Sequence, residues 1–269
     1  MEIFSVLKFE IKRNYKSILI FSGLVGGFIL LMSSIFEPEF FSGYNDIMSG
    51  LPPELLEFVG GLVDLSTFEG FFNLYIFEMS WMWYGLYLIL KVATDIPAEM
   101  ENKTIDLVLS KPIKRWEFVL GKQLLHIITI FAAILLSSLC TLIAIAANPN
   151  VNPTEVDIGG FILCFVLLGF LLLAIESTAL VISTISGSKK STIVGFAIVM
   201  GLWFITAYSG SIPIDNIEYI SFFTYFDSRA ILIDGVLTGI LGNIFILLGY
   251  SVVLSAISIV YFTKRDIPV

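Results

Sequence analysis

The chain has 269 residues, of which 57% are hydrophobic and only 14% are charged, and its mean hydropathy is +0.92. Soluble domains carry roughly 25% charged residues, so this composition excludes an ordinary water-soluble domain and predicts a protein that is solvated by lipid. The formal net charge is -8, and we expect no nucleic-acid partner for such a chain.

The apolar runs are unbroken over about 20 residues, which is the length of a helix that crosses the hydrocarbon core. Barrel strands would instead alternate over about ten residues. The sequence therefore predicts an all-α polytopic membrane protein that forms a single transmembrane domain, 1–269. Six spans are expected, at about residues 17–36, 72–94, 121–147, 158–186, 190–209 and 240–262.

Residues 1–16 precede the first span and carry an amphipathic pattern. Ile3, Phe4, Leu7 and Ile11 recur at helical spacing, and basic residues fall largely on the other side. This pattern predicts a helix that lies in the membrane interface and contacts anionic membrane lipids. An extension of the first span is the alternative.

The loop after the first span, 37–71, is long and acidic. Its charged residues are Glu37, Glu39, Asp46, Glu54, Glu57, Asp64 and Glu69, with no Lys or Arg. We expect this loop to face outward. A vestibule that attracts cations and a simple accumulation of acids in a translocated loop both remain open.

Lys and Arg side chains gather on alternate loops, which fixes the predicted orientation because basic residues are retained on the cytoplasmic side. Arg229 is the one basic residue expected outside. The other fourteen of the fifteen Lys and Arg residues lie in four places: before span one, in or near the segment between spans two and three, in the turn after span four, and at the C-terminal end. The sequence thus predicts a multi-pass protein of the cell membrane with cytoplasmic N- and C-termini.

The polar stretch 95–120 separates spans two and three. Glu101, Ile105, Val108 and Leu109 share one helical face, Ser110-Lys111-Pro112 interrupts the run, and Trp116 lies on a second helix that leads into span three. Such an element offers charged and apolar faces to a cytosolic partner.

This stretch resembles a known family. The string Glu99-x-Glu101-x-x-Thr104-x-Asp106-Leu107-x-Leu109-Ser110-x-Pro112-Ile113-x-Arg115-x-x-Phe118-x-x-Gly121-Lys122 is similar to the loop between spans two and three in ABC-2-type transporter membrane subunits. The external hairpin 210–239 adds Phe222-Phe223-Thr224-Tyr225-Phe226-Asp227, which is similar to a segment of bacterial and archaeal members. Lys103 departs from the family, which usually has Gly there.

The resemblance implies a fold of the ABC-2 (type V exporter) kind and a permease subunit of an ATP-binding-cassette transporter that exports its substrate. The loop would include a coupling helix that contacts a P-loop ATPase subunit, and a second permease, identical or paralogous, would complete the assembly. The coupling residues carried over are Glu99, Glu101, Thr104, Ile105, Asp106, Leu109, Pro112 and Arg115.

The chain has no G-x-x-x-x-G-K-[ST] string, so we expect ATP to be bound by the partner subunit and this chain to be neither an enzyme nor a cofactor carrier. An ion-coupled secondary transporter or channel is the alternative function. An intramembrane metalloenzyme is excluded, because the single histidine cannot supply an H-E-x-x-H motif.

Two carboxylates lie inside predicted spans, where ionisable residues usually face protein or a wet cavity: Glu78 and Glu176. Both are candidates for a translocation path, with a structural hydrogen bond for Glu176 and solvation for Glu78 as the alternatives. His126, the cysteines Cys140 and Cys164, and the span-two aromatics Trp81, Trp83, Tyr84 and Tyr87 are expected to be packed residues. A stacking surface for an amphipathic substrate is the alternative for the aromatics.

Overall fold

We analysed a computed structural model that describes residues 2–50, 52, 63–102, 113–186, 188 and 190–265. These residues form helices and turns, and no strand occurs among them. The all-α prediction is therefore confirmed for the described part of the chain. The α-helices are α1 (Glu2–Ser34), α2 (Pro38–Ser49), α4 (Phe68–Phe72), α5 (Leu86–Glu101), α7 (Arg115–Ala147), α8 (Ile158–Ser186), α9 (Ser191–Ala207), α10 (Ser228–Leu232) and α11 (Ile240–Lys264).

Four of these helices, α1, α7, α8 and α11, are long and apolar enough to cross a membrane. α9 is apolar but has only 17 residues. The second predicted crossing is built from α4, two π-helical turns, η1 (Asn73–Phe77) and η2 (Trp81–Gly85), and α5. Three short 3₁₀ turns follow α9: η3 (Ser209–Ser211), η4 (Ile217–Ile220) and η5 (Phe222–Tyr225). η4 and η5 lie within the predicted hairpin, and η3 begins at the last residue of the predicted fifth span.

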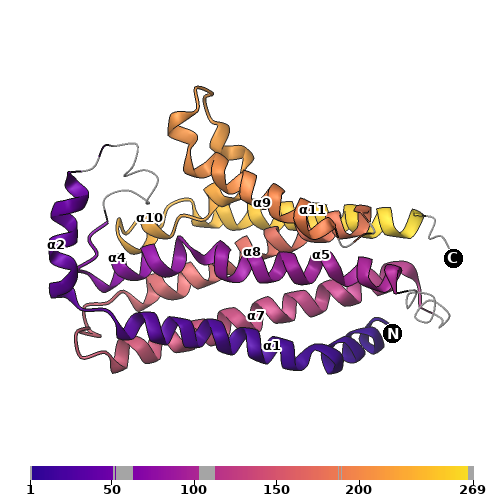
Figure 1. Ribbon diagram of the computed structural model, residues 1–269, viewed down its shortest axis with the longest axis horizontal. Coiled ribbons are helices and arrows are strands. Elements are labelled where there is room, and N and C mark those ends of the chain that lie inside the picture. The colour runs from indigo at the N-terminus through magenta and orange to yellow at the C-terminus, as the bar shows by residue number, and fades with distance from the viewer. Residues whose placement is uncertain are drawn as a thin grey trace.

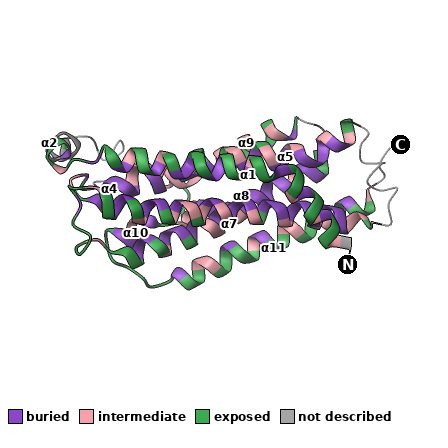
Figure 2. Cartoon of the chain, turned by 90° about the horizontal axis from the view of Figure 1, so that it is seen from below, coloured by how far each residue is buried: buried purple, intermediate pink, exposed green. Residues whose placement is uncertain are grey.

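The long helices run roughly alongside one another, and both chain ends lie at the same end of the bundle (Figure 1). We call this the termini end, and the opposite one the far end. α8 is the central helix, since it packs against α5, α7, α9 and α11. Figure 2 shows the same arrangement by burial: α8 is mostly buried, whereas α1 and α11 each turn an exposed face outward.

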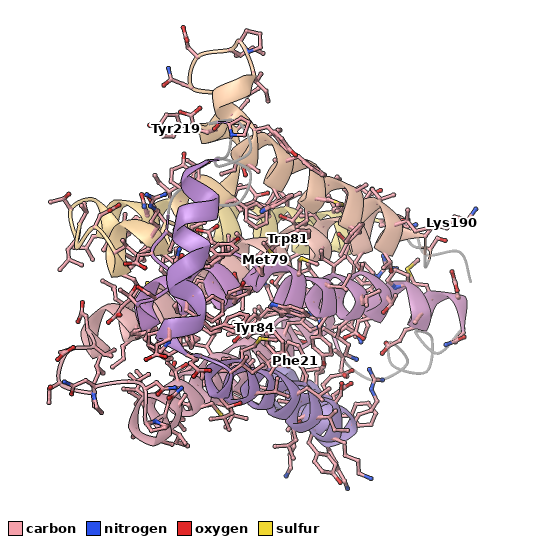
Figure 3. The ribbon with its side chains drawn as sticks, turned by 60° about the vertical axis from the view of Figure 1, so that its left-hand side comes forward. Phe21, Met79, Trp81, Tyr84, Lys190 and Tyr219 are labelled. Carbon is pink, nitrogen blue, oxygen red and sulfur yellow. The ribbon has the colours of Figure 1, made fainter. Side chains whose placement is uncertain are left out.

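Aromatic side chains fill the core of the far end. Phe72 and Phe77 of the second crossing contact Phe161 and Phe165 of α8 at centroid distances between 5.0 and 6.4 Å. Nearer the middle, Phe21 of α1 lies beside Tyr84, with ring centroids 6.3 Å apart (Figure 3). A smaller apolar cluster, which includes Val92, Phe118, Leu180 and Phe262, forms the core at the termini end.

Short polar side chains fix where several helices begin. The Glu117 carboxylate accepts a hydrogen bond of 2.9 Å from the Lys114 amide at the start of α7. Asp227 accepts one of 2.9 Å from the Ala230 amide at the start of α10. Both bonds satisfy amides that have no partner in the first helical turn.

α5 continues through Pro97 to Glu101, so the first seven residues of the predicted loop 95–120 are helical. Proline has no amide hydrogen, and the carbonyl of Ala93 four residues earlier loses its usual helical partner. The Ser191 hydroxyl, from the start of α9, donates to that carbonyl at 2.6 Å. A neighbouring helix thus replaces the missing bond, which lets α5 pass the proline.

From Glu2 on, the predicted interfacial segment is continuous with the first span in α1. Its buried face is formed by Val6, Glu10 and Asn14, while Phe4 is 72% exposed. The structure therefore does not separate an interfacial helix from a span here. Ile3, Leu7 and Ile11 are only partly buried, and the buried side includes Glu10, whose carboxylate contacts Lys122 of α7.

Candidate functional site

A cluster of polar and charged side chains is enclosed by four helices in the half of the bundle nearest the termini. We call it the ionic cluster, and its members are Glu10, Arg13, Asn14, Lys91, Asp95, Glu99, Lys122, His126 and Glu176. They come from α1, α5, α7 and α8. Charged groups in an apolar interior are costly unless they are paired, so this arrangement needs each charge to have a partner.

Lys122 of α7 is fully buried and lies at the centre of the first half of the cluster. Its ammonium nitrogen is 2.8 Å from Glu99 Oε1 of α5 and 3.5 Å from Glu10 Oε1 of α1. Arg13 contacts the same two carboxylates, at 2.8 Å from Glu10 and 3.1 Å from Glu99. Two cations and two anions thus hold three helices together.

The second half of the cluster is a chain of polar contacts across the bundle. Lys91 donates to Asn14 Oδ1 at 2.9 Å and lies 3.0 Å from Asp95. Asp95 Oδ2 is 3.0 Å from His126 Nε2, and His126 Nδ1 is 3.0 Å from Glu176 Oε1. His126 and Glu176 are each 1% exposed, so this contact is shielded from solvent.

The two ends of the predicted coupling loop are attached to the bundle at different places. Glu99 is bound within the ionic cluster, whereas Glu101 is exposed at the end of α5. On the other side of the loop, Arg115 donates to the Arg265 carbonyl. The Arg265 guanidinium in turn donates to the Thr184 carbonyl at 2.7 Å, so the start of α7 is linked to the ends of α11 and α8.

Gly121 allows α1 and α7 to pack closely beside the ionic cluster. A Cβ atom at this position would lie 2.6 Å from Cγ1 of Val6, which is too short for an unstrained contact. The glycine lets α1 pack directly on α7, and this packing brings Glu10 to Lys122.

Five of the predicted coupling residues, Thr104, Ile105, Asp106, Leu109 and Pro112, lie outside the described residues. The two intramembrane candidates do not come together. Glu176 is bound by His126, whereas Glu78 interacts electrostatically with Asp227 and Arg229, which flank the start of α10.

The span-two aromatics pack within the protein to different degrees. Tyr84 is buried and its hydroxyl donates to Ser137 at 2.7 Å, and Tyr87 stacks on Phe21 with a centroid distance of 3.7 Å. Trp83 is 41% exposed. Cys140 and Cys164 are buried and free. Among the residues that the structure covers, no group of three or more His, Cys, Asp or Glu side chains is placed to hold a metal ion.

Comparison with known protein families decides the identity of the chain. A family described as ABC-2 family transporter protein matches residues 19–267. The chain belongs to the ABC-2 transporter family. The family prediction made from the loop motif is thereby confirmed, and no matching sequence was found among curated proteins.

As a member of this family, the ABC-2 protein is a membrane component of a transport system. Permeases of the family generally work with an ATP-binding subunit. The motif residues Glu99, Gly121 and Lys122 lie side by side at the ionic cluster. Sequence analysis did not identify the cluster itself. One sequence pattern could have indicated the cluster. Polar residues occur in pairs at i, i+4 spacing within apolar stretches, such as Lys91 with Asp95 and Lys122 with His126.

Proposed function

We propose that this chain is the permease subunit of an ATP-binding-cassette exporter of the cell membrane. The ATP would be hydrolysed by a separate P-loop ATPase subunit, which contacts the loop 95–120 from the cytoplasm. A second permease subunit, identical or paralogous, completes the transporter. The family match supports the transport role, and the N- and C-termini would be cytoplasmic on the basis of the Lys and Arg distribution.

The observation that carries the coupling role is the way both ends of the loop are held. Glu99 joins the last turns of α5 to Lys122 of α7 and to Arg13 of α1. Arg115 joins the other end to α11 and α8 through Arg265. A force applied to the loop would therefore reach four of the long helices through short, charge-assisted contacts.

Co-purification and ATP hydrolysis test the proposal. The tagged chain, solubilised in mild detergent, is expected to retain an ATPase subunit. In the reconstituted complex, Glu101→Ala and Thr104→Ala are expected to reduce coupled ATP hydrolysis, because both belong to the loop that we propose the partner contacts.

Glu155→Ala is the matched control, since Glu155 is an exposed glutamate in the turn between α7 and α8 at the far end. It should leave hydrolysis unchanged. If no ATPase is retained and the loop variants behave like the control, the coupling role is wrong. Transport that then persists with an ion gradient alone would favour the alternative, an ion-coupled secondary transporter or channel.

A further inference from the structure

His126 is held between two carboxylates, and both of its ring nitrogens are engaged. Nε2 lies 3.0 Å from Asp95 Oδ2, and Nδ1 lies 3.0 Å from Glu176 Oε1. A neutral imidazole has one donor nitrogen and one acceptor nitrogen, whereas an imidazolium has two donors. Two ionised carboxylates at hydrogen-bonding distance can both be satisfied only by two donors.

The charges around the ring agree with this geometry. The ionised groups contributed by the packed elements are Glu10 and Arg13 from α1, Lys91, Asp95 and Glu99 from α5, Lys122 from α7, and Glu176 from α8. Within the described ranges, four carboxylates of the cluster therefore face three Lys and Arg side chains. α11 contributes Tyr250, whose hydroxyl pairs with Thr178 of α8 at 3.0 Å. With a neutral His126 the cluster would carry one uncompensated negative charge in a buried place, which is costly.

We propose that His126 holds a resident proton and is an imidazolium shared between Asp95 and Glu176 inside the bundle. The structure thus contains a proton-binding site whose ligands come from α5, α7 and α8. The proton supplies the positive charge that balances the cluster, and it joins the central helix α8 to α5, to which α8 has no other ion pair in the described part of the chain.

The ring itself is buried, since His126 is 1% exposed. By the rise of about 1.5 Å per residue, the eleven residues from Arg115 to His126 put it roughly 16 Å along α7. The contact between α5 and α8 through this ring therefore depends on the resident proton.

Nuclear magnetic resonance of the full chain in lipid nanodiscs tests the proposal directly. His126 is the single histidine of the chain, so ring ¹⁵N labelling of histidine in an untagged chain gives one pair of nitrogen signals. At pH 7.5 both nitrogens are expected to carry hydrogen. A neutral tautomer at this pH in the folded chain would overturn the proposal.

Two variants extend the test. Removing one carboxylate makes the numbers of negative and positive side chains in the cluster equal when the His126 ring is neutral. Glu176→Gln and Asp95→Asn are each expected to give a neutral His126 at pH 7.5, whereas Glu155→Gln, an exposed control, leaves the imidazolium signals unchanged. Imidazolium signals in both cluster variants would contradict the charge balance. The wild-type spectrum decides the protonation state even where a variant fails to fold, and no ATPase subunit is required, so this test is independent of the proposed transport function.

Discussion

Lys122 shows how a charged side chain is accommodated in the interior of this protein. It is 0% exposed, and its ammonium group lies between Glu99 and Glu10 and 5.2 Å from the centre of the Phe118 ring. Removing one member of a buried ion pair leaves the other charge without compensation, which costs more than the pair itself contributes. Lys122 should therefore be among the positions most sensitive to loss of charge.

Lys122→Met keeps most of the side-chain volume and removes the charge. Glu10 and Glu99 would then share the half-exposed Arg13. We expect the variant to lower the free energy of unfolding by about 3–5 kcal/mol, as breaking a buried pair does. Lys264→Met is the control, because Lys264 is exposed in the last turn of α11. Thermal unfolding in detergent measures both, and equal midpoints for the two variants would show that the pairing with Glu99 and Glu10 does not stabilise the bundle.

Single residues of the cluster were only partly predictable from sequence. Glu176 was identified because a carboxylate inside an apolar run is unusual. Glu10 and Asp95 were not, since each lies near the polar end of a helix, where a charge is normally solvated. Their burial depends on how α1, α5 and α7 pack, and no local pattern encodes that packing.

At the scale of elements, α5 and α9 are joined by a bond that compensates for a proline. Ser191 is 0% exposed, and its hydroxyl donates to the Ala93 carbonyl that Pro97 leaves without a helical partner. A buried carbonyl without a donor costs more than an average hydrogen bond contributes. Ser191 and Pro97 should therefore be energetically coupled.

Ser191→Ala is expected to cost about 1–3 kcal/mol of unfolding free energy, because it leaves the Ala93 carbonyl unpaired. In a Pro97→Ala background the restored amide can serve that carbonyl, and the cost of Ser191→Ala should fall. A double-mutant cycle measures the difference, with a coupling energy of about 0.5–3 kcal/mol expected.

Ser138→Ala serves as the reference for this cycle, since the Ser138 hydroxyl donates to the Ile134 carbonyl of its own helix at 2.8 Å. Its effect should not depend on Pro97. Additive effects of Ser191→Ala and Pro97→Ala would mean that the Ser191 hydroxyl does not substitute for the amide that Pro97 lacks.

Helix positions were the most predictable part of the fold, and helix ends were the least. The predicted span 158–186 coincides with α8 (Ile158–Ser186), because a long apolar run between polar turns has few alternative conformations. The predicted second span ends at about residue 94, whereas α5 continues through Pro97 to Glu101. The compensating Ser191 is distant in sequence, so the sequence near Pro97 does not indicate this continuation. The π-helical turns in the second crossing were not predictable either, because the pattern of apolar residues was compared only with the 3.6-residue period of an α-helix.

The whole molecule has both chain ends at one end of the bundle (Figure 1). This placement is what an even number of crossings requires, but it does not state which end faces the cytoplasm. That assignment rests on the alternating Lys and Arg distribution, and it can be tested without knowing the substrate.

Single-cysteine labelling in intact cells tests the orientation. Glu155→Cys at the far end should react with a membrane-impermeant maleimide, because we place this end outside, and Lys264→Cys should react only after permeabilisation. Both positions are exposed, and the native Cys140 and Cys164 are buried, so the unmodified chain is the blank. The reverse pattern would invert the predicted topology.

For the molecule as a whole, the loop motif predicted the family, and the composition predicted a helical membrane protein. The substrate path was not predictable from the same information. Glu78 and Glu176 were grouped as one candidate because both are intramembrane carboxylates, yet Glu176 pairs with His126 and Glu78 faces Asp227 and Arg229. Sequence distance and hydropathy do not report which helix faces point at each other.

The two π-helical turns, η1 and η2, set the angular position of everything that follows them in the second crossing. A π-turn adds one residue to an α-helical repeat, and each residue of an α-helix accounts for about 100° of rotation. Relaxing one of these turns into regular α-helix would swing Lys91, Asp95 and Glu99 by that angle relative to the aromatic residues at the far end. The aromatic and ionic residues of this crossing therefore face their partners together only while both extra residues are retained. Deleting one residue there would rotate all later residues of the crossing about the helix axis relative to the earlier ones.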